Sequence, residues 1–208
     1  MHRPIALVSR LAAMCVAVMF SISTVAAERP PPAELDAEQE AIVEAVEARL
    51  NAIEKMAGGF VLHTRSGRFP GRFYIDRPGQ RMRLDFDEPL GDIILVRGDT
   101  LEFFGGDMAL RSDAEGTPLT FLLTDTIRLG GDLRVLQVRE RGSGVSIALD
   151  QQSRPDEGQI VMRFERNPEL MLVDVGTFDA DGTYRRIELT DVDFQPFLPD
   201  TLFRHQPR

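Results

Sequence analysis

From Phe60 onward the chain is built of short runs that alternate apolar and polar residues, with turn residues between them. In Arg81–Phe86, for example, arginine or aspartate alternates with methionine, leucine and phenylalanine. This alternation is typical of a β-strand with one buried face. About ten such runs, roughly ten residues apart, predict one large antiparallel sheet, which tends to curl or to close into a barrel. The predicted strands are Phe60–Phe69, Arg72–Ile75, Arg81–Phe86, Asp92–Val96, Leu101–Phe104, Arg134–Arg139, Val145–Leu149, Ile160–Phe164, Leu170–Val175 and Tyr184–Leu189.

Two helices are expected to cover the apolar face of this sheet. Asp36 is the predicted N-cap, and Gln39 three residues later completes a capping box. The helix is predicted over Ala37–Met56 and is expected to end at Gly58-Gly59. A second, short helix is predicted over Leu119–Leu123, where a Thr-Pro pair precedes an apolar run. The apolar residues of the first helix share one helical face: Ile42, Val43, Val46, Leu50 and Ile53.

The N-terminal segment has the three parts of a cleavable export signal. Two arginines precede the apolar, uncharged run Leu11–Val25, and small residues favour cleavage after Ala27. The run is too short for a typical membrane span, which needs about 20 residues. Met14 stands where a lipoprotein signal has a small residue before its cysteine, so lipidation of Cys15 is not expected. Residues 1–27 are therefore predicted to be a signal peptide, 28–35 a flexible leader and 36–208 a single domain.

The charge of the mature chain excludes some classes of partner. The whole chain has a net charge of −9, and the signal holds two arginines and no acid, so the mature part has −9 − 2 = −11. Such an acidic protein is not expected to bind nucleic acid or an anionic membrane surface. The only cysteine lies in the signal, so neither a disulfide nor thiol chemistry is expected.

No motif for catalysis or for a metal or other cofactor is found. The mature chain has two histidines, His63 and His205, and neither has a sequence neighbour that completes a triad or a metal site. Residues 177–188 approach a calcium-loop pattern, but the flanking residues are typical of strands, so a hairpin turn at Asp181-Gly182 is favoured. We therefore expect a protein that is not an enzyme. An apolar face under a thin helical cover can be a filled core or a ligand cavity, and composition does not decide between them.

A family resemblance favours the cavity. Residues 71–104, GRFYIDRPGQRMRLDFDEPLGDIILVRGDTLEFF, and residues 117–123, TPLTFLL, resemble in order and spacing the characteristic segments of LolA, the periplasmic lipoprotein carrier family. The resemblance covers essentially the whole mature chain. It implies a mainly β fold with helices (α+β), in which a curled antiparallel sheet forms a half-open β-barrel covered by a helical lid.

The function that the resemblance implies is that of a periplasmic carrier. Such proteins take acylated lipoproteins from an inner-membrane ABC exporter and deliver them to an outer-membrane receptor. The carrier is expected to be a monomer in the periplasm of a Gram-negative bacterium. Three alternatives stay open: a carrier or sensor of the same fold for another amphiphile, such as a lipid or glycolipid; a structural β-domain with a filled core; and a hydrolase whose site has no recognisable motif.

The resemblance also suggests site residues. Arg77 matches the family arginine that precedes a proline, and its guanidinium could latch the lid by donating hydrogen bonds to carbonyls at helix ends. The residues expected to contact cargo follow from apolar periodicity and position, and those on strands depend on the register. They are Leu50, Ile53, Phe73, Ile75, Met82, Leu84, Phe86, Ile94, Leu119 and Leu122.

Overall fold

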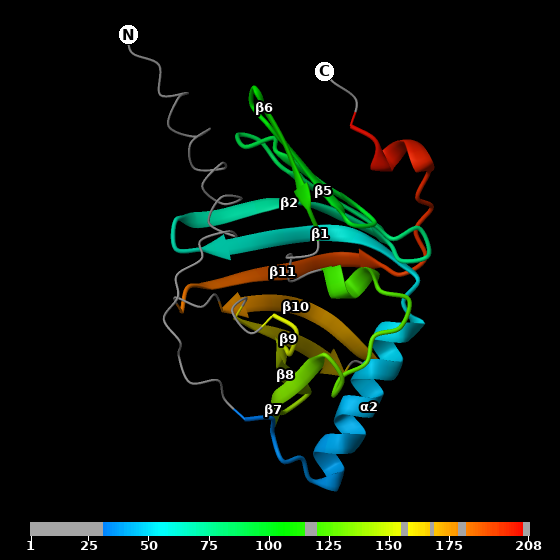
Figure 1. Cartoon of the computed structure of the whole chain (residues 1–208), viewed down its shortest axis with the longest axis vertical. Helices are drawn as coiled ribbons and strands as arrows, with labels where there is room; N and C mark the ends of the chain where they lie inside the picture. The colour runs from blue at the N-terminus through cyan, green and yellow to red at the C-terminus, as the bar shows by residue number, and fades with distance from the viewer. Residues whose placement is uncertain (1–30, 115–119, 155–157, 167–168, 179–181, 206–208) are drawn as a thin grey trace.

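The computed structural model contains one antiparallel sheet of eleven strands, which curls around its helices without closing (Figure 1). The structure describes residues 31–114, 120–154, 158–166, 169–178 and 182–205. The strand order is β6-β5-β4-β3-β2-β1-β11-β10-β9-β8-β7, so β6 and β7 are the two edges. The predicted fold class is confirmed. The strands are β1 (Lys55–Thr64), β2 (Gly67–Asp76), β3 (Arg81–Phe86), β4 (Ile93–Arg97), β5 (Thr100–Gly105), β6 (Met108–Asp113), β7 (Leu133–Arg141), β8 (Gly144–Gln151), β9 (Gln159–Arg166), β10 (Leu170–Phe178) and β11 (Tyr184–Asp193).

Two strand predictions differ from the structure. The run Phe60–Phe69 is not one strand, because a turn at Arg65 and Ser66 divides it between β1 and β2. The edge strand β6 was missed. Five of its six residues are exposed, so its sequence lacks the alternation that marks a half-buried strand.

The first helix, α2 (Ala37–Ala52), begins as predicted and ends early. Asp36 Oδ1 accepts a hydrogen bond from Gln39 N at 2.9 Å, and Gln39 Oε1 accepts one from Asp36 N at 3.2 Å, which confirms the capping box. The predicted end at Met56 is wrong, because Lys55 and Met56 already pair with β2. Gly58-Gly59 does not end the helix. It lies in β1, where a Cβ at Gly59 would be 2.5 Å from Thr190 Oγ1 of β11.

The inner face of the sheet, defined as the face that packs against α2, carries the main apolar core. The helix lies across the end of the sheet formed by β7–β10 and buries Ile42, Val43, Val46 and Leu50 there (Figure 1). Fully buried strand residues such as Ile147, Leu149 and Met162 face this helix side of the core. Because α2 contacts β7 and β10, the inner face of β2–β6 is left to a thinner cover.

The last described residues cross the outer face of β3–β5. Arg83 Nη1 donates to Leu202 O at 2.7 Å, and Arg81 pairs with Asp200 of the 3₁₀ helix η4 (Asp200–Phe203) at 2.8 Å. The Arg81 guanidinium lies 4.4 Å from the centre of the Phe203 ring, which is buried. This segment therefore closes the outer face of these strands and leaves their inner face as the available one.

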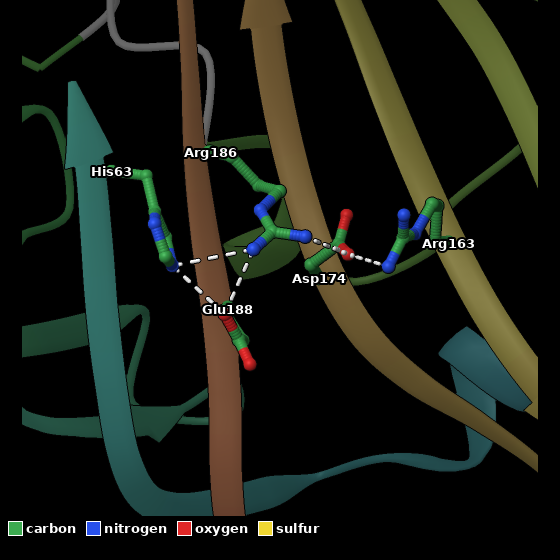
Figure 2. Close-up of polar contacts among 5 residues, drawn as sticks. All are labelled: His63, Arg163, Asp174, Arg186 and Glu188. Atoms are coloured by element: carbon green, nitrogen blue, oxygen red, sulfur yellow. Dashed lines mark hydrogen bonds and ion pairs between the residues drawn. The ribbon is translucent and has the colours of Figure 1, made fainter. Parts of the chain in front are cut away.

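A charged network on the outer face joins the two halves of the sheet (Figure 2). His63 Nε2 on β1 lies 2.8 Å from Glu188 Oε2 on β11, and Arg186 Nη2 donates to the same oxygen at 2.8 Å. Arg186 also approaches Asp174 on β10, which pairs with Arg163 on β9 at 2.7 Å. Burial raises the pKa of Asp174, and the two arginines oppose the rise. The partner of His63 was not expected from sequence, and the network ties four strands together across the junction of β1 with β11.

The remaining predictions about the chain termini and turns are limited to the described part. The predicted signal, residues 1–27, lies outside it. At the end of the predicted leader, Ala33 N donates to Val135 O at 2.9 Å and Leu35 packs against the core. Phe178 and Tyr184 pair across β10 and β11, so the segment considered as a calcium loop joins two strands as a hairpin, although residues 179–181 are not described.

Candidate ligand-binding site

The six strand residues predicted to contact cargo all lie on the inner face. Directly paired residues share a face of a sheet, and the pairs are Phe73 with Leu84, Ile75 with Met82, and Leu84 with Ile94. Phe86 follows by alternation along β3. Phe73, Ile75 and Met82 are buried, whereas Leu84, Phe86 and Ile94 are half-buried. The six residues therefore share one face of the sheet, while contact with cargo stays a prediction.

The predicted helix residues meet this face at its centre. Leu50 and Ile53 are buried at the end of α2, and Leu122 is buried in the 3₁₀ helix η2 (Thr120–Leu123). Leu119 lies outside the described residues. Leu122 closes a cavity of about 30 Å³, which has room for about two water molecules. The cavity is lined only by apolar residues: Met56, Phe73, Ile75, Met82, Leu84, Leu122, Leu172, Val175, Ile187 and Leu189.

Arg77 joins the end of α2 to the chain that follows η2. Its Nη1 donates to Leu50 O at 2.6 Å and Ile53 O at 2.9 Å. Its Nη2 donates to Thr124 O at 2.8 Å and Asp125 O at 3.2 Å. Carbonyls at helix ends lack partners within the helix, and one planar guanidinium has enough donors to satisfy all four. These are the kind of contacts expected of a latch between the sheet and both helices.

The turn after β2 holds Arg77 in place. Arg77 N donates to Glu54 O at 2.9 Å, and Gln80 N donates to Arg77 O at 2.8 Å. The Asp76 carboxylate accepts from Arg81 Nε at 2.7 Å and so ties the start of β3 to the end of β2. Burial lowers the pKa of Arg77, and the nearby charges of Asp125 and Glu54 oppose the change. The guanidinium therefore stays charged while it is only 7% exposed.

Two residues that sequence reasoning missed hold the same segment. Asn51 Oδ1 accepts from Ile127 N and Asn51 Nδ2 donates to Ile127 O, both at 2.8 Å, as a neighbouring strand would. Glu47 Oε2 accepts from Leu129 N at 2.8 Å. Both residues lie one turn apart on α2, and an asparagine near the end of an amphipathic helix was the only available signal. Hereafter, residues 120–129 are called the lid segment.

A larger cleft lies along the lid segment, in addition to the small cavity. It has a volume of about 420 Å³, and Phe121, Leu123 and Thr126 form part of its wall. Turn residues of the β2–β6 half, including Asp99, and residues at the start of β7 and the end of β8 complete it. The lid segment therefore has free space beside it, into which a short helix could move.

The inner face also carries one acid that sequence reasoning did not single out. Asp92 directly precedes β4. Alternate residues along a strand face the same side, so Asp92 lies on the inner face with Ile94 and Val96. It is 5% exposed, and burial raises its pKa from 3.8 to about 6. An acid at an apolar-face position of a predicted strand was the signal that could have found it.

Comparisons with known proteins agree with this architecture. The family model of the outer membrane lipoprotein carrier protein LolA matches residues 52–206. The chain belongs to the LolA family. Members of this family are periplasmic carrier proteins rather than enzymes. A search of curated proteins finds no match. Among the described residues of this LolA-family chain, no helix is both long and apolar enough to cross a membrane, and no group of acids and histidines could hold a metal.

Two solved structures with TM-scores of 0.50 share the fold at low sequence identity. An uncharacterised conserved protein from Thermus thermophilus is 12% identical with a TM-score of 0.50, covering 81% of this chain and 94% of that one. MucB is 12% identical with a TM-score of 0.50, covering 82% of this chain and 64% of that one. A LolA superfamily protein from Nitrosomonas europaea is 12% identical with a TM-score of 0.44, covering 78% of this chain and 97% of that one.

The buried acid predicts an unusual pH dependence of stability. Because the pKa of Asp92 is higher in the folded chain than in the unfolded chain, the folded state binds more protons between pH 4 and 6. The contribution is therefore fully present below pH 4 and is lost as the pH rises through 6. Asp92→Asn cannot lose this contribution. The difference in the free energy of unfolding, variant minus wild type, should therefore increase by about 3 kcal/mol from pH 4 to pH 7.5. Urea unfolding at both pH values measures the difference. Asp107→Asn, at an exposed acid of the β5–β6 turn, is the control. If Asp92→Asn differs from the wild type by the same free energy of unfolding at both pH values, the prediction is wrong.

Proposed function

We propose that the protein is a periplasmic carrier that binds the acyl chains of lipoproteins on the inner face of its sheet and delivers them to an outer-membrane receptor. The observation that carries the proposal is an apolar inner face that one short helix, η2, covers at its centre. One arginine, Arg77, holds the chain that follows this helix. The family membership supports the same conclusion. In this proposal, Leu50, Ile53, Leu122 and the six inner-face strand residues contact the acyl chains.

The physical need for such a carrier is large. Burial of acyl chain is worth about 0.8 kcal/mol per CH₂, so three chains with roughly forty methylenes would cost on the order of 30 kcal/mol in water. A lipoprotein therefore leaves a membrane only when an apolar surface replaces the bilayer. The half-buried residues Leu84, Phe86 and Ile94, together with Ile187 and Leu189 of β11, offer such a surface.

The size of the closed cavity requires the lid segment to move. A space of about 30 Å³ does not hold an acyl chain. Displacing Leu122 and its neighbours would expose the inner face, while the contacts from Arg77, Asn51 and Glu47 would be given up. Cargo binding then exchanges lid contacts for acyl-chain contacts, so a modest free-energy difference separates the loaded and empty states. Such a balance permits both loading and release.

The remaining parts of the proposal concern location and partners. The predicted signal would export the chain, and an inner-membrane ABC exporter would load it. A carrier that shuttles between two membranes is expected to be a monomer without an anchor. Sensing or carrying another amphiphile on the same inner face is the alternative, and it is an outcome of the first experiment below.

Release of lipoproteins from spheroplasts tests the proposal. We expect the purified mature protein to release newly made lipoproteins into solution as a one-to-one complex, because its inner face replaces the membrane. Immunoprecipitation of the supernatant measures the release, and buffer without the protein is the control. If no lipoprotein is released but a fatty-acid photoprobe labels the inner face, another amphiphile is the cargo. If neither occurs, the core is filled and the carrier proposal is wrong.

The role of Arg77 as a latch predicts the behaviour of Arg77→Leu. Without the guanidinium, four carbonyls lose their donor and the closed, empty state is destabilised relative to the loaded one. We expect bound lipoprotein to be transferred to the receptor at least tenfold more slowly, as measured by its appearance in receptor-containing membranes. Arg72→Leu, on the exposed outer face of β2, should transfer at the normal rate. Normal transfer by Arg77→Leu would show that the latch is not needed.

A further inference from the structure

Asp92 lies within a row of inner-face residues that crosses β1–β6. Phe60 pairs with Gly71, Gly71 with Phe86, and Phe86 N donates to Asp92 O at 2.8 Å. On the other side of Asp92 lies Gly105, which pairs with Met108 of the edge strand. Asp92 is therefore the one charged residue in a row of phenylalanine, glycine and methionine.

The carboxylate lies directly over Gly105. A Cβ added at Gly105 would be 2.4 Å from Asp92 Oδ1 and 2.6 Å from Cζ of Phe103. The carboxylate oxygen and the Phe103 ring thus meet above a residue that has no side chain of its own. The Phe86 ring, which packs edge to face on Phe60 with centroids 5.2 Å apart, stands on the opposite side in the row.

This carboxylate lacks the partners that a buried acid normally has. Within the described residues, no hydrogen bond or ion pair reaches it, and burial is the sole cause of its raised pKa. Buried polar groups are almost always hydrogen-bonded, because desolvation without a partner is costly. The Asp92 side chain is 95% removed from solvent, yet its oxygens are not fully buried, so the carboxylate is accessible to a group supplied from outside the chain.

The surroundings favour a cation. The exposed charged residues in the two turns nearest Asp92 are acids: Asp87 and Glu88 before β4, and Asp107 between β5 and β6. The exposed Arg65 at this end lies in the β1–β2 turn, two strands away from β4. Phe103 meets the carboxylate above Gly105, and Phe86 is the neighbour of Asp92 in the row. Aromatic rings attract ammonium groups. Leu110 and Met108, 49% and 39% exposed, extend the apolar surface along the edge strand, where an alkyl chain could lie.

We propose that Asp92 is a recognition site for an amphiphile that carries a primary ammonium group next to its acyl chain, with the ammonium on the Asp92 carboxylate between Phe86 and Phe103. This inference rests on the proposed binding of acyl chains at the inner face and adds a headgroup preference to it. The site lies at the end of the sheet opposite Arg77, because the β3–β4 and β2–β3 turns are at opposite ends of β3. Headgroup recognition and lid latching are therefore spatially separate.

Two amphiphiles of equal chain length test the proposal on the mature protein. Dodecylammonium and the neutral dodecanamide each compete with a fluorescent apolar probe, N-phenylnaphthylamine, at pH 7.5. We expect dodecylammonium to bind about tenfold more tightly to the wild type, and the two to bind within about twofold of one another in Asp92→Asn. In the wild type the preference for dodecylammonium should also decrease from pH 7 to pH 5, because Asp92 becomes protonated while the ammonium stays charged. The other titrating groups at this end are Asp87, Glu88 and Asp107.

The controls separate this inference from the proposed function. Asp107→Asn removes an exposed acid from the same end and should keep the tenfold preference. Equal binding of the two amphiphiles to the wild type, or an equal loss of preference in Asp107→Asn and Asp92→Asn, overturns the Asp92 site while leaving acyl-chain binding intact. If neither amphiphile displaces the probe, acyl-chain binding itself fails, and the headgroup site fails with it. The cooperative urea unfolding of Asp92→Asn described above shows that the variant is folded.

Discussion

The convergence of four backbone carbonyls on the Arg77 guanidinium is the interaction on which the closed structure depends. Two carbonyls end α2 and two follow η2, so the same side chain fixes both helices to the turn after β2. Without a donor these buried carbonyls would each carry a desolvation cost. Because the arginine is supplied by a turn that Asp76 holds rigid, the sheet dictates where the lid segment lies.

The two ends of the sheet differ in how they are packed. The β7–β10 end packs against α2 and contains the fully buried residues, so it provides stability. The β2–β6 end is closed on its outer face by the C-terminal segment and only thinly covered on its inner face. The junction of β1 with β11, with its outer-face network, keeps the two ends in one curved surface. A stable end and an exchangeable end are compatible with a protein that must bind and release an apolar ligand.

Alternation, turn residues and the capping box were enough to predict the sheet and the start of α2, whereas the strand residues chosen for cargo contact depended on a register that the sequence left open. The helix end was missed because a Gly-Gly pair such as Gly58-Gly59 occurs both at the end of a helix and where two strands approach closely. The strand β6 was missed because an edge strand with both faces exposed has no alternation. The partners of Asn51, Glu47 and His63 depend on contacts between residues 76 to 125 positions apart, which no local pattern contains.

In the proposed carrier, the lid segment leaves the inner face when an acyl chain binds. This movement can be measured by electron–electron resonance distances between spin labels at Thr126→Cys in the lid segment and Arg72→Cys on β2, with a pair at Arg72 and Arg139 as the sheet reference. Addition of an acylated lipopeptide should shift the first distance distribution to longer values and leave the reference pair unchanged. A lipopeptide that binds with both distributions unchanged would contradict the account.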